Sequence, residues 1–165
     1  MSEAPRVGII MGSDSDWPIM QAAGEACKEL GVGFEADVRS AHRMPDETIE
    51  YGRTAADRGI GVIIAGAGGA AHLPGVLAAV SPLPVIGVPI PLKYMDGMDS
   101  LLSIVQMPSG VPVASVGVGN ARNAGLLAVR ILAATDPELR KRVVEFQAEL
   151  SDKARAKGEA VRNAT

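Results

Sequence analysis

Aromatic residues and cysteine are scarce in this sequence of 165 residues, which holds one Trp, two Tyr, two Phe and one Cys. So few aromatic side chains disfavour a flavin site, because flavin proteins usually stack the ring of the cofactor on aromatic residues. The single cysteine, Cys27, excludes a disulfide within the chain, and its helical surroundings indicate a small core residue. We therefore expect the protein to work in a reducing cytoplasm.

The sequence also lacks the residues that other common ligands require. Its two histidines and one cysteine are scattered, so no cluster of zinc or iron ligands is expected. No G-x-x-x-x-G-K-(S/T) loop is present for ATP. The formal charge of −3 offers no basic surface to nucleic acid. The N-terminal segment Met1–Arg6 carries Glu3 and has no long apolar run, so we expect no signal peptide.

Charged residues are absent from two long stretches, 59–92 and 100–121. Repeated glycines, prolines and serines in these stretches would break a membrane-spanning helix, so we expect no membrane segment. The stretches indicate instead the buried centre of one domain that spans residues 1–165. They hold more apolar surface than one small domain can easily bury, which favours a homo-oligomer.

Short apolar runs alternate with helical patterns along the chain. Strands are expected at Arg6–Met11, Phe34–Val38, Val62–Ile64, Val85–Val88 and Val113–Val118. Helices are expected at Pro18–Leu30, from Pro45 to about Arg58, at Leu73–Val80 and from Ala121 to about Ala134. This alternation without hairpin signals predicts an α/β fold, a three-layer αβα sandwich around a five-stranded parallel sheet. Five strands favour the flavodoxin-like order 2-1-3-4-5.

An extra C-terminal helix follows a core of about 6–135. It begins at Asp136-Pro137, extends over about 137–156 and carries an apolar stripe at Leu139, Val143, Phe146 and Leu150. The helix could pack on a neighbouring subunit or on its own domain, and the sequence leaves both open. The polar tail after Lys153 is expected to fray.

The corner Gly66–Ala71 fits the G-x-G-x-x-(G/A) fingerprint of dinucleotide sites. Such sites also need an acidic residue roughly twenty positions later, and the first one here is Asp96. Nicotinamide cofactors are therefore disfavoured. The corner could bring the backbone close to a small, flat ligand, or it could simply be a tight turn. The turn-rich segment Gln106–Pro112 could cover a site as a lid or be a plain surface loop.

The loop Gly12–Pro18 joins the first strand to the first helix and contains two serines and two aspartates. Helix capping explains one of these four residues. The others could bind a phosphate through hydroxyls and backbone N–H groups, and a sugar through one carboxylate. Two carboxylates would repel a phosphate, so at most one of Asp14 and Asp16 should face it. Capping and phosphate binding both remain open.

His42 follows the second strand, with Ser40 and Arg43 close by in the sequence. The unperturbed pKa of histidine is about 6.5, so a histidine beside an anion site could give and take a proton at neutral pH. It could equally be a structural or solvated histidine. In the order 2-1-3-4-5, the Ser13–Asp16 loop and the Gly66–Ala71 corner face one crevice with His42 at its side. These features favour an enzyme or binder for a phosphorylated small molecule, without a cofactor.

Five motifs, taken together, resemble the class I N5-carboxyaminoimidazole ribonucleotide mutases of purine biosynthesis. They are GSDSDW at 12–17, SAHRMPD at 40–46, AGAGGAAHLPG at 65–75, DSLLSIVQMPSGVPV at 99–113 and NAGLLAVRIL at 123–132. The resemblance implies an isomerase that moves a carboxylate from the exocyclic nitrogen of an aminoimidazole ribotide to ring carbon C4. It implies passage through CO2 held in the pocket, no metal, ATP or biotin, and a homo-octamer.

The resemblance also implies roles for individual residues. His42 would be the general acid and base, Asp16 would hold the ribose hydroxyls, and His72 would have at most a supporting role. The residues that would hold the phosphate are Ser13, Ser15, Ser40 and Arg43. The residues that would enclose the base and the CO2 are Ala67 and Gly68, through their backbone, and Leu73, through its side chain.

Two other functions remain as alternatives. A sister class carboxylates the ribotide directly with CO2, but it tends to have lysine in place of Arg43 and lacks the AAHLPG ending of residues 70–75. A nucleotide-sensing module would keep the pocket without the chemistry, and the presence of His42 argues against it.

Overall fold

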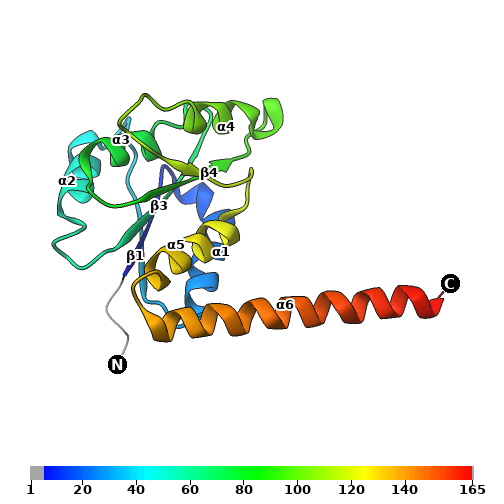
Figure 1. The fold of residues 1–165 in the computed structure, drawn as a ribbon. Coiled ribbons are helices and arrows are strands. Elements are labelled where there is room, and N and C mark those ends of the chain that lie inside the picture. The colour runs from blue at the N-terminus through cyan, green and yellow to red at the C-terminus, as the bar shows by residue number, and fades with distance from the viewer. Residues whose placement is uncertain (1–5, 165) are drawn as a thin grey trace.

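Five parallel strands form the centre of the computed structural model, which describes residues 6–164 (Figure 1). They are β1 (Val7–Met11), β2 (Phe34–Val38), β3 (Val62–Gly68), β4 (Val85–Ile90) and β5 (Ala114–Ser115). The strand order β2-β1-β3-β4-β5 confirms the predicted order. The absence of a signal peptide was predicted largely from Met1–Pro5, which lie outside the described residues.

The fifth strand is shorter than the predicted Val113–Val118, because only Ala114 and Ser115 pair regularly with β4. Beyond them the chain still follows β4, with Val116 N donating to Gly87 O at 3.1 Å and Gly119 N to Pro89 O at 2.8 Å. Pro89 has no N–H to return such a bond, so the regular ladder ends here.

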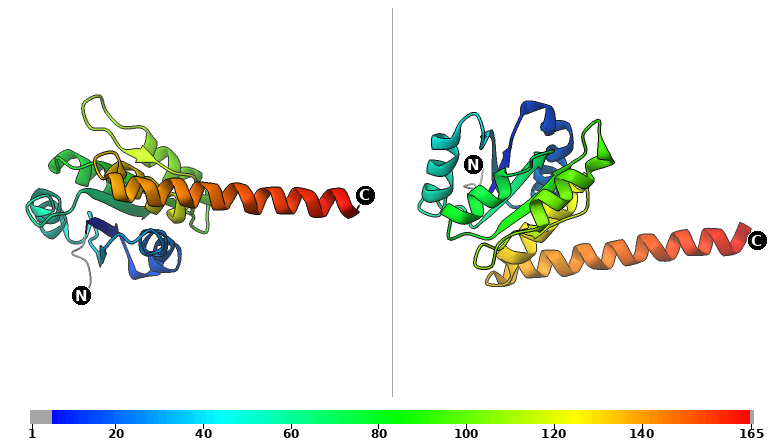
Figure 2. Two further views of the ribbon diagram at one scale, coloured as in Figure 1. Left: turned by 60° about the horizontal axis from the view of Figure 1, so that its bottom comes forward. Right: turned by 90° about the horizontal axis from the view of Figure 1, so that it is seen from above.

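Helices cover both faces of the sheet, as predicted (Figures 1 and 2). On one face lie α1 (Trp17–Glu29), α5 (Ala121–Ala133) and the start of α6 (Pro137–Ala164). On the other face lie α2 (Pro45–Thr54), α3 (Leu73–Val80) and α4 (Met98–Val105). Neighbouring strand residues alternate between the two cores: Ile9 and Ile64 pack under α1 and α5, whereas Ile10 and Ile63 pack under α2 and α3. None of the helices between residues 6 and 164 combines the length and hydropathy that a membrane crossing needs.

The last helix, α6, extends for 28 residues and projects beyond the rest of the molecule (Figures 1 and 2). Only Leu139, Val143 and Phe146 are buried in it, all within its first half and against its own domain. The expectation that the tail frays after Lys153 is wrong, since the helix continues to Ala164. Strong helix formers fill this tail, and ion pairs such as Arg155–Asp152 at 2.7 Å support it.

Candidate active site

A cavity of about 420 Å³ lies at the carboxyl ends of the central strands. Residues from the loops after β1, β2 and β3 line it, and Leu92 contributes from the segment after β4. β1 and β3 flank the point where the strand order reverses, which is where open α/β sheets bind ligands. The cavity brings together the following residues predicted for the site: Ser13, Ser15, Asp16, Ser40, His42, Arg43, Ala67, Gly68 and Leu73.

The first wall is a short 3-10 turn, Asp14–Asp16, that opens α1. Ser13 caps it, since its hydroxyl accepts from Ser15 N at 3.4 Å and its own N–H donates to the Asp16 carboxylate at 3.1 Å. Capping therefore occupies both Ser13 and Asp16, more than the sequence suggested. The hydroxyls of Ser13 and Ser15 lie 3.0 Å apart on the cavity wall, where they can turn to a ligand.

Asp16 is the acidic side chain in the cavity wall, and it is 7% exposed. Burial raises the pKa of Asp16, although the N–H groups of Ser13 and Gly12 and the nearby Arg43 act in the opposite direction. Asp14, in contrast, is exposed and accepts a hydrogen bond from the Ser13 hydroxyl at 3.1 Å. Only one of the two carboxylates thus faces the cavity.

Arg43 supplies positive charge to the cavity and is fixed from two sides. Its Nε donates to the hydroxyl of the buried Ser40 at 3.2 Å, and its Nη2 donates to Gly12 O at 2.9 Å. These bonds tie the loop after β2 to the end of β1. The guanidinium, two serine hydroxyls and the N-terminal end of α1 thus lie together in one cavity, and groups of these kinds are suited to bind an anion.

The two histidines of the chain, 30 positions apart, meet at the edge of the cavity. His42 Nε2 and His72 Nδ1 lie 2.7 Å apart, with the rings nearly perpendicular at 84°. His42 sits in the turn before α2, and His72 stands at the start of α3, where its C=O accepts from Val76 N at 3.0 Å. His72 is the one predicted site residue outside the cavity lining.

Close packing and one tight turn shape the glycine-rich corner. Gly66 is still inside β3, where a Cβ would overlap the sulfur of Met20. Gly69 turns the chain with a φ of +65° and donates its N–H to the hydroxyl of Ser100 at 2.8 Å. The buried Ser100 in turn donates to Ile90 O at 2.7 Å. Ser100 therefore fastens the corner to the end of β4.

Sequence reasoning missed Leu92, Ala70, Ala41 and Gly12, which also line the cavity. Leu92 could have been predicted from the sequence, because the order 2-1-3-4-5 places the end of β4 beside the end of β3. The contact of His72 with His42 could not be predicted in this way, since it depends on two side-chain rotamers.

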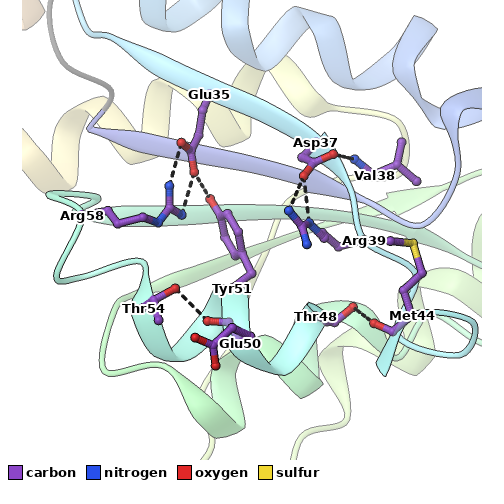
Figure 3. Close-up of polar contacts among 10 residues, drawn as sticks. All are labelled: Glu35, Asp37, Val38, Arg39, Met44, Thr48, Glu50, Tyr51, Thr54 and Arg58. Atoms are coloured by element: carbon purple, nitrogen blue, oxygen red, sulfur yellow. Dashed lines mark hydrogen bonds and ion pairs between the residues drawn. The ribbon is translucent and has the colours of Figure 1, made fainter. Parts of the chain in front are cut away.

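A larger groove of about 960 Å³ lies between β2 and α2 (Figure 3). Four of the charged side chains that line it form ion pairs. Glu35 binds Arg58 at 2.8 Å and accepts from the Tyr51 hydroxyl at 2.8 Å. Arg58 accordingly lowers the pKa of Glu35. Asp37 pairs with Arg39 at 2.8 Å. These paired groups need no ligand, and the smaller cavity lies at the switch point of the sheet, where open α/β folds bind ligands, so it is the better candidate.

The chain is similar to known proteins along nearly its whole length. The AIR carboxylase family model matches residues 6–153. The N5-carboxyaminoimidazole ribonucleotide mutase of Mycobacterium leprae is 63% identical over 157 residues, covering 95% of this chain and 92% of that protein. The protein of the same name from Synechocystis is 58% identical over 149 residues, covering 90% and 85%. The crystal structure of Treponema denticola PurE matches with a TM-score of 0.86 at 27% identity, covering 94% of this chain and 98% of that one.

Proposed function

This chain belongs to the AIR carboxylase family, and from that premise we propose that it is an N5-carboxyaminoimidazole ribonucleotide mutase, an isomerase of purine biosynthesis. The observation that carries the proposal is the single cavity in which three separate motifs meet, at the switch point between β1 and β3. Each motif offers a different function: an anion site, a proton carrier and an apolar wall.

The substrate fits this cavity with its phosphate at the cationic end. Arg43 and the hydroxyls of Ser13, Ser15 and Ser40 bind the phosphate, and Asp16 accepts hydrogen bonds from the ribose hydroxyls. The aminoimidazole then lies against the backbone of Ala67 and Gly68. The side chain of Leu73, which is 2% exposed, closes a small apolar space suited to CO2.

The reaction needs one proton carrier that works in both directions. The bond between nitrogen and carboxylate breaks, CO2 departs, and protonated His42 gives its proton to the nitrogen, which becomes an amine. Ring carbon C4 then attacks CO2, and neutral His42 removes the proton from C4. The first step leaves His42 in the form that the second step requires, so each turnover regenerates the enzyme. This sequence balances without a metal, ATP or another cofactor.

Three further observations support the proposal of a homo-oligomer, and the family resemblance implies an octamer. The second half of α6 has no buried residue, although a lone helix gains little stability from water-exposed turns. In addition, large apolar side chains lie exposed on α4 and the segment before it, namely Tyr94, Met95, Met98, Leu102 and Val105. His42 and His72 are also exposed in the single chain, so a second copy would help to keep water from the CO2. We place the protein in the cytoplasm, where its lone Cys27 would stay reduced.

Two separate assays test the function. The enzyme is given the N-carboxylated ribotide in one, and the uncarboxylated aminoimidazole ribotide with bicarbonate in the other. We expect rapid formation of the C4-carboxylated product only from the N-carboxylated ribotide. Turnover of the ribotide with bicarbonate alone would reject the mutase and identify a direct carboxylase instead.

A His42→Asn variant tests the assignment of the proton carrier. Its amide cannot accept and return a proton at this position, so we expect kcat to fall by at least about a hundredfold. Isomerisation at the parent rate would assign the proton transfer to another group.

A further inference from the structure

The contact between His42 and His72 leaves room for one hydrogen only. At 2.7 Å, one of the two facing nitrogens must donate and the other must accept. The contact therefore links the tautomers of the two rings. Which ring donates can be decided from the position of His42 and from the chemistry proposed for it.

The two nitrogens of His42 have different surroundings. Nε2 is engaged by His72, which does not line the cavity, whereas His42 itself does. Within residues 6–164, no protein group hydrogen-bonds Nδ1 of His42. Nδ1 is thus the nitrogen that a ligand in the cavity can reach.

We propose that His42 exchanges its proton with the substrate through Nδ1, while His72 acts as a positioning residue that accepts a hydrogen bond from His42 Nε2–H. This inference rests on the proposed function, because it refines how His42 performs the two proton transfers. It assigns a role to His72 that the AAHLPG motif alone does not define.

The direction of the hydrogen bond follows from the two steps. In the first step His42 is protonated on both nitrogens, so Nε2–H must donate and His72 Nδ1 must carry no hydrogen. Loss of the Nδ1 proton to the substrate nitrogen leaves neutral His42 with the hydrogen on Nε2 and a free electron pair on Nδ1. That pair accepts the C4 proton in the second step. Were His72 the donor, neutral His42 would carry its hydrogen on Nδ1 and could not accept a proton there.

The backbone around His72 suits it to hold another ring in place. His72 N donates to Ala70 O at 2.9 Å, and Ala71 N donates to Gly69 O at 2.8 Å. The next residues, Leu73 and Pro74, are buried. His72 therefore presents Nδ1 from a fixed turn at the start of α3, which limits rotation of the His42 ring.

Nitrogen-15 NMR of the full-length protein tests the tautomers directly, because the chain has two histidines and hence a simple imidazole spectrum. The His42→Asn variant identifies which signals belong to which ring. With both rings in the neutral form, we expect both to carry their hydrogen on Nε2. A spectrum in which His42 carries it on Nδ1 would overturn the proposal, whether or not the enzyme is active.

Two variants of His72 test its contribution to turnover. His72→Asn keeps an oxygen near the place of Nδ1, and His72→Leu removes the acceptor at similar volume. We expect His72→Leu to lower kcat by about tenfold to a hundredfold with little change in KM, and His72→Asn to recover part of the loss. Parent kcat in His72→Leu, a loss confined to KM, or no recovery in His72→Asn would contradict a positioning role.

Failure of this inference differs from failure of the proposed function. If the parent enzyme isomerises the N-carboxylated ribotide but the tautomers are reversed, proton exchange through Nδ1 and the role of His72 are both wrong, while the proposed function stands. If the parent enzyme does not isomerise it at all, the function falls and the proposal that rests on it falls too. Should His72→Leu fold poorly, the NMR measurement on the parent still decides the direction of the hydrogen bond.

Discussion

At the scale of single residues, the buried carboxylate of Asp16 lowers the stability of the native protein. Burial raises its pKa in the native protein above the value in the unfolded chain. The native state therefore binds this proton more tightly than the unfolded chain does, and ionisation of Asp16 at neutral pH lowers the free energy of unfolding. This penalty disappears as the pH falls below both pKa values. A carboxylate kept in spite of it is expected to bind something, and the ribose hydroxyls are our candidate.

Replacing Asp16 by Asn tests whether the buried carboxylate lowers stability while it contributes to binding. The amide oxygen can still accept the hydrogen bond from Ser13 N–H. We therefore expect the free energy of unfolding to rise by about 1 kcal/mol at neutral pH, and KM to increase. The stabilisation should shrink as the buffer is made acidic, because Asp16 itself then becomes neutral. Melting curves across the pH range measure it. A variant that is less stable at neutral pH, or equally altered at every pH, would contradict the pKa argument.

Cys27 gives a prediction about chemical reactivity. Cys27 belongs to α1 and its thiol is fully buried in the core, which raises its pKa to about 12. Because the thiolate is the reactive form, we expect native protein to resist Ellman's reagent at mildly alkaline pH. The denatured protein serves as the control and should react with one equivalent of reagent. Rapid reaction of the native protein would place Cys27 outside the core.

The sequence predicted which residues lie together where strand order determines their positions. It did not predict contacts that depend on side-chain rotamers. Ser13, Arg43 and Gly68 could be brought to one crevice by strand order alone. The capping role of Asp16 and the contact of His72 with His42 could not, since both depend on side-chain directions that the motif does not encode. Ser100 was missed because its role arises from contacts with Gly69 and Ile90, distant in the sequence.

At the scale of elements, α1 and α5 pack closely because glycines and alanines line their contact. A Cβ added to Gly125 of α5 would come within 2.9 Å of the Ala26 methyl group and would also overlap Ala23 O. Backbone atoms of α1 cannot move aside easily, so the helices would have to separate. This contact holds the layer beneath the cavity in place.

Gly125→Ala should therefore destabilise the fold by about 1–3 kcal/mol, despite the better helix propensity of alanine. Gly158→Ala is a matched control in the projecting part of α6, where the added Cβ meets only the Arg162 side chain at 3.4 Å. We expect the control to be neutral or stabilising by up to about 1 kcal/mol. Chemical denaturation compares the two. Equal effects would argue against tight packing of α1 on α5.

The elements themselves were largely predictable because apolar runs and helix starts are local signals. Pro45 and Pro74 mark the beginnings of α2 and α3, and buried runs mark β1 and β3. Other ends differ from the prediction: β3 continues past Ile64 to Gly68, β4 continues past Val88 to Ile90, and α2 ends at Thr54 rather than near Arg58. Two further ends were wrong for physical reasons. β5 loses its ladder opposite Pro89, and α6 continues past Lys153 because its tail consists of strong helix formers.

At the scale of the whole molecule, the projecting half of α6 is the feature least explained by a single chain. Removing residues 151–165 should leave the buried part of α6 intact while deleting turns that no part of the domain covers. If these turns join copies together, light scattering will show a smaller assembly than the parent. A parent that is monomeric at micromolar concentration would reject the oligomer.

The most direct test of the account follows the carboxylate itself. The N-carboxylated ribotide is labelled with carbon-13 in its carboxylate and converted by the enzyme in a large excess of unlabelled bicarbonate. If CO2 stays in the cavity beside His42 and Leu73 between the two steps, the label will appear on C4 of the product in nearly full yield. Product that carries unlabelled carboxylate would mean that CO2 escapes and returns from solution, and the closed transfer proposed for this cavity would be wrong.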